Sequence, residues 1–376
     1  MSLSSGLQKL NGRGEVYPQT RVCGTLLFQV KKMAYSTGLF LASATSVVNA
    51  LADVSRKKAI AGNDLFAAAF WVRLIATAVF AIAFLWHLCT GGSIYIRGDG
   101  QLPWALAQSI PAIVIFFLYL LLDTGLVAIS ILLYYRALQI SDLSLSIPFL
   151  SFTPAMLVIT GSLLLHEVPG PEKVIGVGLV VLGSLVMTRN AFRFGLLGPV
   201  KALFRDQGSR CMLGVAFILS ITNPIDKKLV IMSDPITYAF AYGMMLLCIL
   251  ALPAARKKTS WTAPLQIAPV WLLLAGILDG SDLLLQFTSH KFIAVVITIT
   301  LKRAGVVLSV LCGWLIFREK QIGDRLLGSA VMLFGVSMIY LPLSMRTCVL
   351  IAIPSVGVAL LLIMQATGRR PIADVS

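Results

Sequence analysis

Apolar residues in this chain form long uninterrupted runs that end at charged residues or at Pro and Gly. Eleven such runs occur, near residues 34–53, 66–89, 111–137, 143–165, 171–188, 211–232, 236–253, 268–289, 293–317, 322–343 and 347–366. An α-helix rising about 1.5 Å per residue crosses a hydrocarbon core of ~30 Å in about twenty residues. A membrane β-barrel would instead show alternating segments of about ten residues. The pattern predicts an all-α polytopic membrane protein of ten spanning helices, with an extra C-terminal hydrophobic segment.

The composition supports this class. Of 376 residues, 58% are hydrophobic and only 12% are charged, whereas soluble domains carry about 25% charged residues. A water-soluble enzyme, a disordered chain and a disulfide scaffold are therefore excluded. The six cysteines are scattered without a CxxC pair, which argues against a zinc site or a redox motif.

The net charge of +15 would suggest nucleic-acid binding in a soluble protein. Here the basic residues lie mostly in short loops, such as residues 56–58 and 256–258. Membrane proteins place Lys and Arg in this way on their cytoplasmic side. We therefore expect no nucleic-acid partner and a location as an integral multi-pass protein of the plasma (inner) membrane.

Two parts of the chain resemble each other. An offset of 152 residues brings Gly161, Glu167, Gly176 and Gly183 onto Gly313, Glu319, Gly328 and Gly335. Upstream, an offset of 170 brings Lys57, Lys58, Asp64, Ala69 and Phe70 onto Lys227, Lys228, Asp234, Ala239 and Phe240. These matches predict an internal duplication, with a longer loop between spans two and three of the first copy.

The repeat defines the expected domain organisation. We predict a polar, unstructured tail at 1–33, a first five-helix repeat at 34–189, a basic linker at 190–210, a second five-helix repeat at 211–343, and an extra hydrophobic segment with a tail at 344–376. Five spans per repeat place the second copy in the membrane upside down. Inverted repeats are typical of secondary transporters, whose binding site lies at the midplane between the halves.

Specific residues carry a resemblance to a known family. The first copy reads RALQISDLSLSIPFLSFTP over 136–154 and ends in Leu165-His166-Glu167, while the second contains Thr300-Leu301-Lys302-Arg303 and ends in Phe317-Arg318-Glu319-Lys320. Both copies resemble the EamA domain of the drug/metabolite transporter superfamily, over about residues 34–343. The resemblance implies ten helices in two inverted five-helix units and the passage of small metabolites. The expected eleventh segment departs from the family pattern.

Charged side chains within a span are costly and usually functional. Lys302 lies near the middle of the ninth span, with Arg303 beside it and Thr298 on the same helical face as Lys302. One interpretation is a cationic site for an anionic or carboxylate-bearing substrate. The alternative is a structural ion pair of Lys302 with Asp279 or Asp282.

Acidic residues within the spans have two interpretations as well. Asp279 and Asp282 share a face of the eighth span, where one could neutralise a cation and the other bind a proton. Arg73 aligns with Gly243, so it has no counterpart in the repeat; pairing with Asp53 or Asp123 is the alternative to a role in the site. We assign Asp123, Asp279 and Asp282 to coupling or charge balance.

Uncharged polar residues complete the expected site. Asn49, and Asn223 beside Pro224, could present unpaired backbone groups to a cavity or join neighbouring helices. Ser144, Pro148 and Ser151 share a face that we expect to line the cavity. Glu167 and Glu319 are expected to cap the helix that follows each of them, and Gly176, Gly178, Gly183, Gly328 and Gly335 to permit close helix packing.

The sequence therefore predicts a secondary active exporter of a small anionic or amino-acid-like metabolite that works by alternating access. Substrate binding is assigned to Lys302, Arg303, Asn49, Arg73, Ser151, Asn223 and Thr298. No cofactor, catalytic residue or metal site is expected; the partners are a small-molecule substrate and the lipid bilayer, and a homodimer is left open. The alternatives are a carrier for phosphorylated or nucleotide-linked sugars, a non-transporting membrane subunit, and a membrane enzyme with a metal at Asp279 and Asp282.

Overall fold

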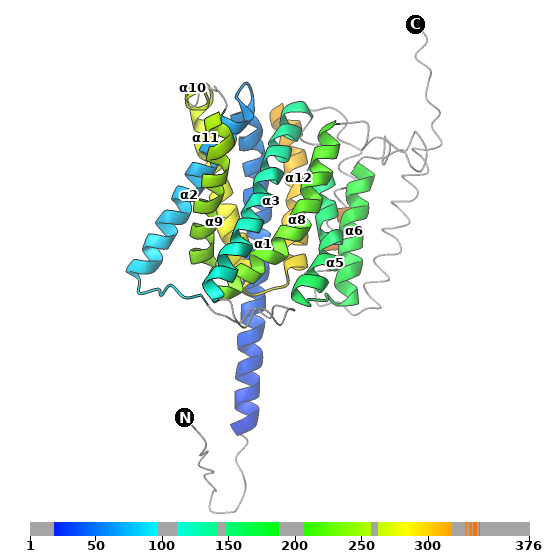
Figure 1. Ribbon diagram of the computed structural model, residues 1–376. Helices are drawn as coiled ribbons and strands as arrows, with labels where there is room; N and C mark the ends of the chain where they lie inside the picture. The colour runs from blue at the N-terminus through cyan, green and yellow to red at the C-terminus, as the bar shows by residue number, and fades with distance from the viewer. Residues whose placement is uncertain are drawn as a thin grey trace, which may run out of the picture.

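The computed structural model describes residues 19–96, 111–141, 147–187, 207–256 and 262–317, together with 328, 331–332, 334–336 and 338. All regular secondary structure within these residues is helical, and most helices run roughly side by side (Figure 1). In chain order the elements are α1 (Gln19–Ile60), α2 (Leu65–Cys89), α3 (Ala112–Ile140), η2 (Ile147–Phe152), α5 (Thr153–Leu165), α6 (Pro171–Met187), α8 (Gln207–Met232), α9 (Pro235–Arg256), α10 (Ala263–Ile267), α11 (Pro269–His290) and α12 (Val295–Phe317).

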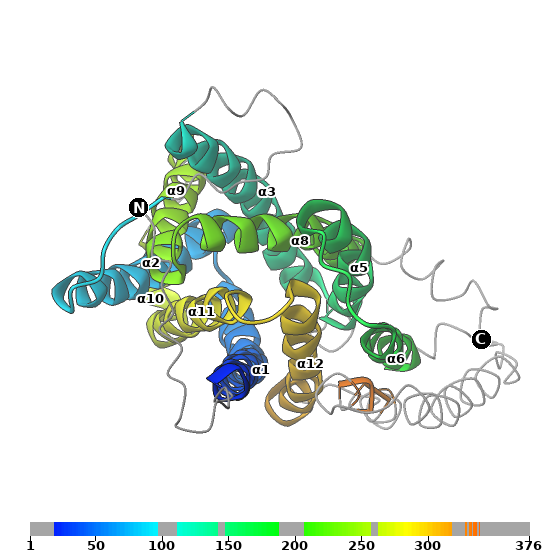
Figure 2. The same cartoon turned by 90° about the horizontal axis from the view of Figure 1, so that it is seen from below.

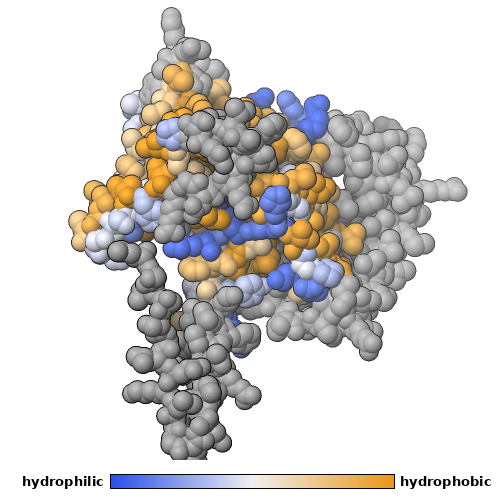
Figure 3. Space-filling view, turned by 60° about the horizontal axis from the view of Figure 1, so that its bottom comes forward, coloured by the Kyte–Doolittle hydropathy of each residue, from blue (hydrophilic) through white to orange (hydrophobic). Residues whose placement is uncertain are grey.

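The outside of the helical assembly is apolar. Large hydrophobic side chains such as Phe40, Trp86, Leu118 and Leu163 are exposed on α1, α2, α3 and α5. Figure 3 shows hydrophobic side chains over the flanks, with hydrophilic ones gathered on the end turned toward the viewer. Apolar exposure on this scale fits a hydrocarbon surrounding rather than water.

Five described segments are long and apolar enough to cross a membrane, which are Lys32–Ile60, Leu65–Cys89, Ala112–Ile140, Pro235–Leu252 and Pro269–His290. Helices α8 and α12 have membrane length too, with 26 and 23 residues, but each carries charged side chains. The expected span 347–366 lies outside the described residues, as does most of 322–343. The chain is therefore an integral multi-pass membrane protein.

The two repeats interlock through their first helices. Helix α1 packs against α11 and α12 of the second repeat, while α8 packs against α3, η2 and α5 of the first. The second helices, α2 and α9, pack against each other, and Phe84 stacks on Phe240 with ring centroids 4.6 Å apart. Seen from below, α1 and α12 lie on one side of α8 and α3 on the other (Figure 2). This exchange brings polar side chains of both repeats together.

The second helix of each repeat begins in the same way. Asp64 accepts hydrogen bonds from the backbone N–H groups of Phe66 and Ala67 at 2.9 and 3.1 Å. Asp234 accepts from Ile236 and Thr237 at 3.0 and 3.1 Å. Each carboxylate thus satisfies N–H groups that have no partner within the first helical turn. The residue pair aligned by the repeat therefore caps α2 and α9.

Two elements differ from the apolar pattern. Helix α1 begins at Gln19, so residues 19–33, expected in an unstructured tail, are helical; Pro18 directly precedes this helix, and a proline is tolerated at a helix start but not inside it. The expected span 143–165 is divided into the 3₁₀-helix η2 and the thirteen-residue α5. Pro154, in the first turn of α5, offers no backbone N–H to a continuous helix.

Glycines allow close contact between α6 and the segment around residues 328–338. A Cβ added at Gly183 would lie 2.6 Å from the carbonyl oxygen of Gly328, and one at Gly335 would lie 2.6 Å from that of Gly176. The expected close packing is confirmed at these positions, which the repeat aligns in pairs. Gly178 differs, since a Cβ there would meet nothing within 4 Å.

Candidate functional site

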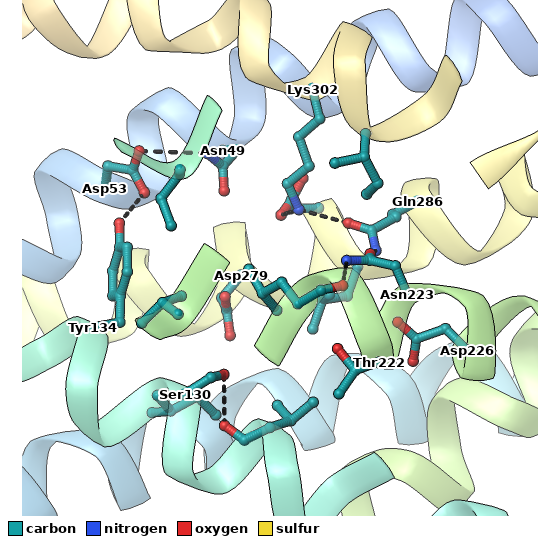
Figure 4. A pocket seen from close by; sticks show the side chains of 18 of the residues that line it. Asn49, Asp53, Ser130, Tyr134, Thr222, Asn223, Asp226, Asp279, Gln286 and Lys302 are labelled. Carbon is teal, nitrogen blue, oxygen red and sulfur yellow. Dashed lines mark hydrogen bonds and ion pairs between the residues drawn. The ribbon is translucent and has the colours of Figure 1, made fainter. Parts of the chain in front are cut away.

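A polar cavity of about 120 Å³ lies between the two repeats. Its walls come from α1, α2, α3, η2, α8, α9, α11 and α12, and Figure 4 shows many of the side chains that line it. Eight charged side chains line it, which are Asp53, Asp226, Asp279, Asp282, Arg56, Arg73, Lys302 and Arg303. Because charge this deep in a membrane protein is costly, the cavity is a candidate functional site.

Lys302 has a carboxylate partner. Its Nζ donates to Asp282 Oδ2 at 2.5 Å and to Gln286 Oε1 at 2.7 Å, both on α11. Lys302 and Asp282 have exposed side-chain fractions of 8% and 2%. The ion-pair alternative considered for Lys302 is therefore present, with Asp282 rather than Asp279 as its partner.

A second ion-pair network joins α1, α2 and α11. Arg56 donates to Asp53 and to Asp279, each at 2.7 Å, and Arg73 Nη1 lies 2.9 Å from Asp279 Oδ2. The expectation that Arg73 pairs with Asp53 or Asp123 is wrong. Helix α2 packs against α11, and this contact brings Arg73 to Asp279. Asp279 therefore neutralises Arg56 on α1 and Arg73 on α2 rather than Lys302.

Arg303 is the exception among the cavity's cations. Its exposed fraction is only 5%, yet within the described part of the chain no ion pair or hydrogen bond holds its guanidinium, and Nε is buried without a partner. Arg56, Arg73 and Lys302 each have a carboxylate within 3 Å. A buried guanidinium that forms no ion pair or hydrogen bond with the described residues, and interacts with Asp53 only at longer range, favours an anionic ligand group beside the cavity.

The side-chain amide of Gln286 connects Asn223 to Lys302 along the cavity wall. Gln286 Nε2 donates to Asn223 Oδ1 at 3.0 Å while Gln286 Oε1 accepts from Lys302. Asn49 Nδ2 lies 3.4 Å from Asp53 Oδ2 on the opposite wall. Asn49 and Asn223 both line the cavity, so the expected polar lining is present at these two positions.

Pro224 leaves a backbone carbonyl of α8 without its helical partner. The freed oxygen of Ser220 accepts a hydrogen bond of 2.6 Å from Thr160 Oγ1 on α5, and the amide of Asn223 donates to Leu219 O. The backbone at Pro224 is therefore satisfied between helices rather than presented to the cavity. The alternative of interhelical bonding applies here.

The structure brings seven of the ten predicted site residues to the cavity, which are Asn49, Arg73, Asn223, Asp279, Asp282, Lys302 and Arg303. Ser151, Thr298 and Asp123 are buried outside its lining. Thr298 lies 3.1 Å from the hydroxyl of Ser289, and Ser151 Oγ has no hydrogen-bond partner among the described residues. Ser144 lies outside the described residues. The expected lining by Ser151 and Thr298 is therefore wrong, and the adjacent residues Leu150 and Ile299 line the cavity instead.

Several lining residues were not predicted from the sequence, namely Asp53 as a lining residue, Arg56, Tyr134, Asp226 and Gln286. Arg56 was assigned to a basic loop, but α1 continues to Ile60 and turns Arg56 inward. In the second repeat Asp226 is followed by Lys227 and Lys228, as Arg56 is followed by Lys57 and Lys58 in the first. The offset of 170 residues aligns Arg56 with Asp226, and this charge reversal between aligned positions was the available signal.

Glu167 caps a helix from the other repeat. Its Oε2 accepts from the backbone N–H of Val295 at 3.2 Å, at the start of α12, and its Oε1 pairs with Lys227. Lys227 also donates to the carbonyl of Ile293 at 2.8 Å. The expectation that Glu167 caps the following helix is wrong, because α5 ends at Leu165, His166 after it is left-handed, and the Glu167 carboxylate reaches Val295 and Lys227. Glu319 lies outside the described residues.

Metal-binding chemistry finds no support in the described ranges. Within them no group of three or more His, Cys, Asp or Glu side chains could hold a metal ion. Asp279 and Asp282, which the enzyme alternative requires as metal ligands, are bound to Arg56, Arg73 and Lys302.

A buried polar cavity between two interlocked helical repeats is typical of membrane transport proteins. The model of the EamA-like transporter family matches the chain twice, over residues 36–189 and 207–341. The chain therefore belongs to the EamA-like transporter family, within the drug/metabolite transporter superfamily.

Comparison with other proteins adds the fold alone. A solved crystal structure with 18% sequence identity superposes with a TM-score of 0.58, covering 82% of this chain and 98% of the other. At this identity the likeness concerns the arrangement of helices. The curated proteins contain no match to the chain.

Proposed function

We propose that this protein is a secondary active exporter of a small metabolite that carries an anionic group, with amino-acid-like molecules as the favoured class. Arg303 binds the anionic group in the cavity between the inverted repeats. The observation that carries the proposal is the buried guanidinium of Arg303, which forms no ion pair or hydrogen bond with the described residues, whereas Arg56, Arg73 and Lys302 each have a carboxylate within 3 Å.

The other walls suit the remainder of such a substrate. Asn49, Asn223 and Gln286 offer amide groups, and Asp226 lines the cavity as a carboxylate that could face an ammonium group. Lys302 takes the role of positioning the wall through Asp282 and Gln286, and it adds positive potential near Arg303. Arg73, Asp279 and Asp282 provide charge balance.

The cavity size supports a small cargo. Its volume of about 120 Å³ is below the ~300–1,000 Å³ of pockets for drug-sized ligands. A nucleotide-linked sugar needs a larger space than this. The charged lining also argues against a non-transporting subunit, since a polar cavity is costly to keep in a membrane protein without a function.

The test compares cells that overproduce the intact protein with cells that carry Arg303→Gln at equal membrane abundance. Small anionic and zwitterionic molecules are measured inside and outside the cells. We expect one class to move outward only with the intact protein, and Arg136→Gln, at an exposed arginine of α3, to behave like the intact protein.

The outcome also separates the alternatives. Export of phosphorylated sugars instead of amino-acid-like molecules would favour the carrier alternative. Unchanged metabolite pools across the whole panel would contradict a transport function and favour the non-transporting subunit.

A further inference from the structure

One phenol contacts two carboxyl groups at the edge of the cavity. Tyr238 Oη on α9 lies 2.5 Å from Asp226 Oδ1 on α8 and 3.3 Å from Asp123 Oδ2 on α3. Exposure is 0% for Asp123 and Tyr238 and 5% for Asp226. Three helices therefore place two acidic groups on the same hydroxyl.

The number of hydrogens available for hydrogen bonding at this site constrains the protonation state of the two carboxyl groups. A phenol has one hydrogen to donate, and an ionised carboxylate has none. If both carboxyl groups were ionised, only one contact of Tyr238 could be a hydrogen bond, and the other would be a repulsion between oxygens. Both contacts are satisfied when the phenol donates to Asp226, at the shorter distance, and a protonated Asp123 donates to the phenol oxygen.

The surrounding charges do not neutralise the pair. Among the groups that interact electrostatically with Asp226 are Tyr238, Asp123 and, as the cation, Lys302. The cations on the surrounding helices interact with other groups. Lys302 pairs with Asp282, Arg73 with Asp279 and Lys227 with Glu167. Lys228 donates to the Tyr119 hydroxyl, and Arg303 faces Asp53 and Tyr134. Of the remaining titratable groups, Tyr242 faces Arg73 and both acids, and His290 faces Lys227 and Lys302.

A second feature points to an exchangeable ligand at this place. Thr222 lies one helical turn before Asp226, lines the same cavity, and has a fully buried hydroxyl without a hydrogen-bond partner in the described ranges. Figure 4 shows Thr222 beside Asp226, with its hydroxyl directed into the cavity. Asp123 Oδ1 also lacks a hydrogen-bond partner within the part of the chain that the structure describes. The site thus has unused polar atoms next to a carboxyl group that reaches the cavity.

We infer that Asp123, Tyr238 and Asp226 form a proton-binding site that couples transport to the proton gradient. The proton resides on Asp123, which lies outside the cavity lining, and passes through the Tyr238 hydroxyl to Asp226: Tyr238 gives its hydrogen to Asp226 as it accepts the one from Asp123. Asp226 exchanges the proton with the cavity. This inference rests on the proposed transport function.

The first test needs no substrate. Infrared spectra of the purified full chain in lipid nanodiscs at neutral pH should show a protonated-carboxyl C=O band. Asp123→Asn should abolish the band, because Asp226 remains with the Tyr238 donor and the positive potential of Lys302. Asp226→Asn should keep the band at a shifted frequency, because Asp123 stays buried without a cation.

Asp64→Asn is the matched control, since Asp64 caps α2 away from the site and accepts two backbone hydrogen bonds. It should leave the band unchanged. Circular dichroism of each variant verifies that the helices are retained. Absence of the band from the intact protein, or a band insensitive to Asp123→Asn, overturns the proton site and leaves the transport proposal standing.

The second test addresses coupling in proteoliposomes, with a labelled mixture of the common amino acids as the probe. Accumulation by the intact protein and by Asp64→Asn should rise several-fold under an imposed pH gradient, and this dependence should be lost in Asp123→Asn. Equal accumulation by the intact protein with and without the gradient would reduce the bound proton to a structural one and overturn coupling. If the intact protein moves no probe at all, that result counts against the proposed function, and the infrared band still decides the proton site.

Discussion

Gln286 donates a hydrogen bond of 3.0 Å to the side-chain oxygen of Asn223, at positions that correspond to a second hydrogen-bonded pair. Tyr134 donates to Asp53 at 2.6 Å, and the offsets of 152 and 170 residues bring Tyr134 onto Gln286 and Asp53 onto Asn223. Each repeat thus joins its first and third helices by a hydrogen bond at the same place. The bond between Tyr134 and Asp53 involves a carboxylate, which requires cations nearby, whereas the bond between Gln286 and Asn223 joins two neutral amides.

The amide pair yields the first prediction. Gln286→Leu removes the acceptor for Lys302 and the donor for Asn223, so buried polar atoms lose partners worth about 1–3 kcal/mol each. We expect a lower thermal unfolding temperature and a transport rate reduced by about tenfold or more, as 1.4 kcal/mol corresponds to a factor of ten. Gln286→Glu keeps the contact to Lys302 and should be the milder change. An equal loss for both variants would show that the contact to Asn223 matters more.

The Lys302–Asp282 pair yields the second prediction. Removing one partner of a buried ion pair leaves an uncompensated charge and costs about 3–5 kcal/mol. Lys302→Met should therefore lower membrane abundance and unfolding temperature, and Lys302→Met combined with Asp282→Leu should recover most of both. Abundance is measured by immunoblot and stability by thermal unfolding in detergent. No recovery in the double variant would contradict a purely pairwise role.

Glu167 and Lys227 yield the third prediction, because their contacts to backbone groups require a carboxylate at position 167 and an ammonium group at position 227. Glu167 accepts from Val295 N, at the positive end of α12, and Lys227 donates to Ile293 O. Exchanging the two charges in Glu167→Lys with Lys227→Glu keeps an ion pair but opposes both backbone contacts. We expect this double variant to be as unstable as Lys227→Met, as judged by thermal unfolding. Recovery to the stability of the intact protein would mean that the ion pair alone suffices.

Close packing through glycine yields the fourth prediction. Gly183→Leu and Gly335→Leu place side chains against the backbone of the facing segment and should lower the unfolding temperature. Gly178→Ala is the matched control on the same helix as Gly183, since its Cβ meets nothing. It should be neutral or stabilising by about 0.5–1 kcal/mol, because Gly is less favourable than Ala in a helix. Destabilisation by all three substitutions would implicate the glycines in something other than this contact.

The local part of the architecture was predictable from the sequence. Long apolar runs are sufficient to predict membrane helices, since a bilayer accepts a backbone only with its hydrogen bonds satisfied internally. The repeat offsets correctly align Asp64 with Asp234, and they align Gly176 with Gly328 and Gly183 with Gly335, where Gly183 packs against Gly328 and Gly335 against Gly176. The breaks in the pattern at residues 147–152 and at Gln19 depend on backbone hydrogen bonding and proline geometry, which hydropathy does not report.

The candidate site was predictable only in part. Charge within a span identified Arg73, Asp279, Asp282, Lys302 and Arg303, all of which line the cavity. It could not show that Lys302 is paired and that Arg303 is not, because a partner twenty residues away in sequence is chosen by the packing of α11 against α12.

By itself, the sequence determined that this protein is helical, lies in the membrane, is built from two related halves and belongs to a family of transporters. Those properties follow from hydrophobic periodicity and from residue identities that recur at constant offsets. The tertiary structure decided which charges neutralise each other, which residues face the cavity, and that Asp123 and Asp226 meet on Tyr238. These relationships join helices far apart in the chain, and electrostatic and hydrogen-bond energies depend on distances that only packing sets.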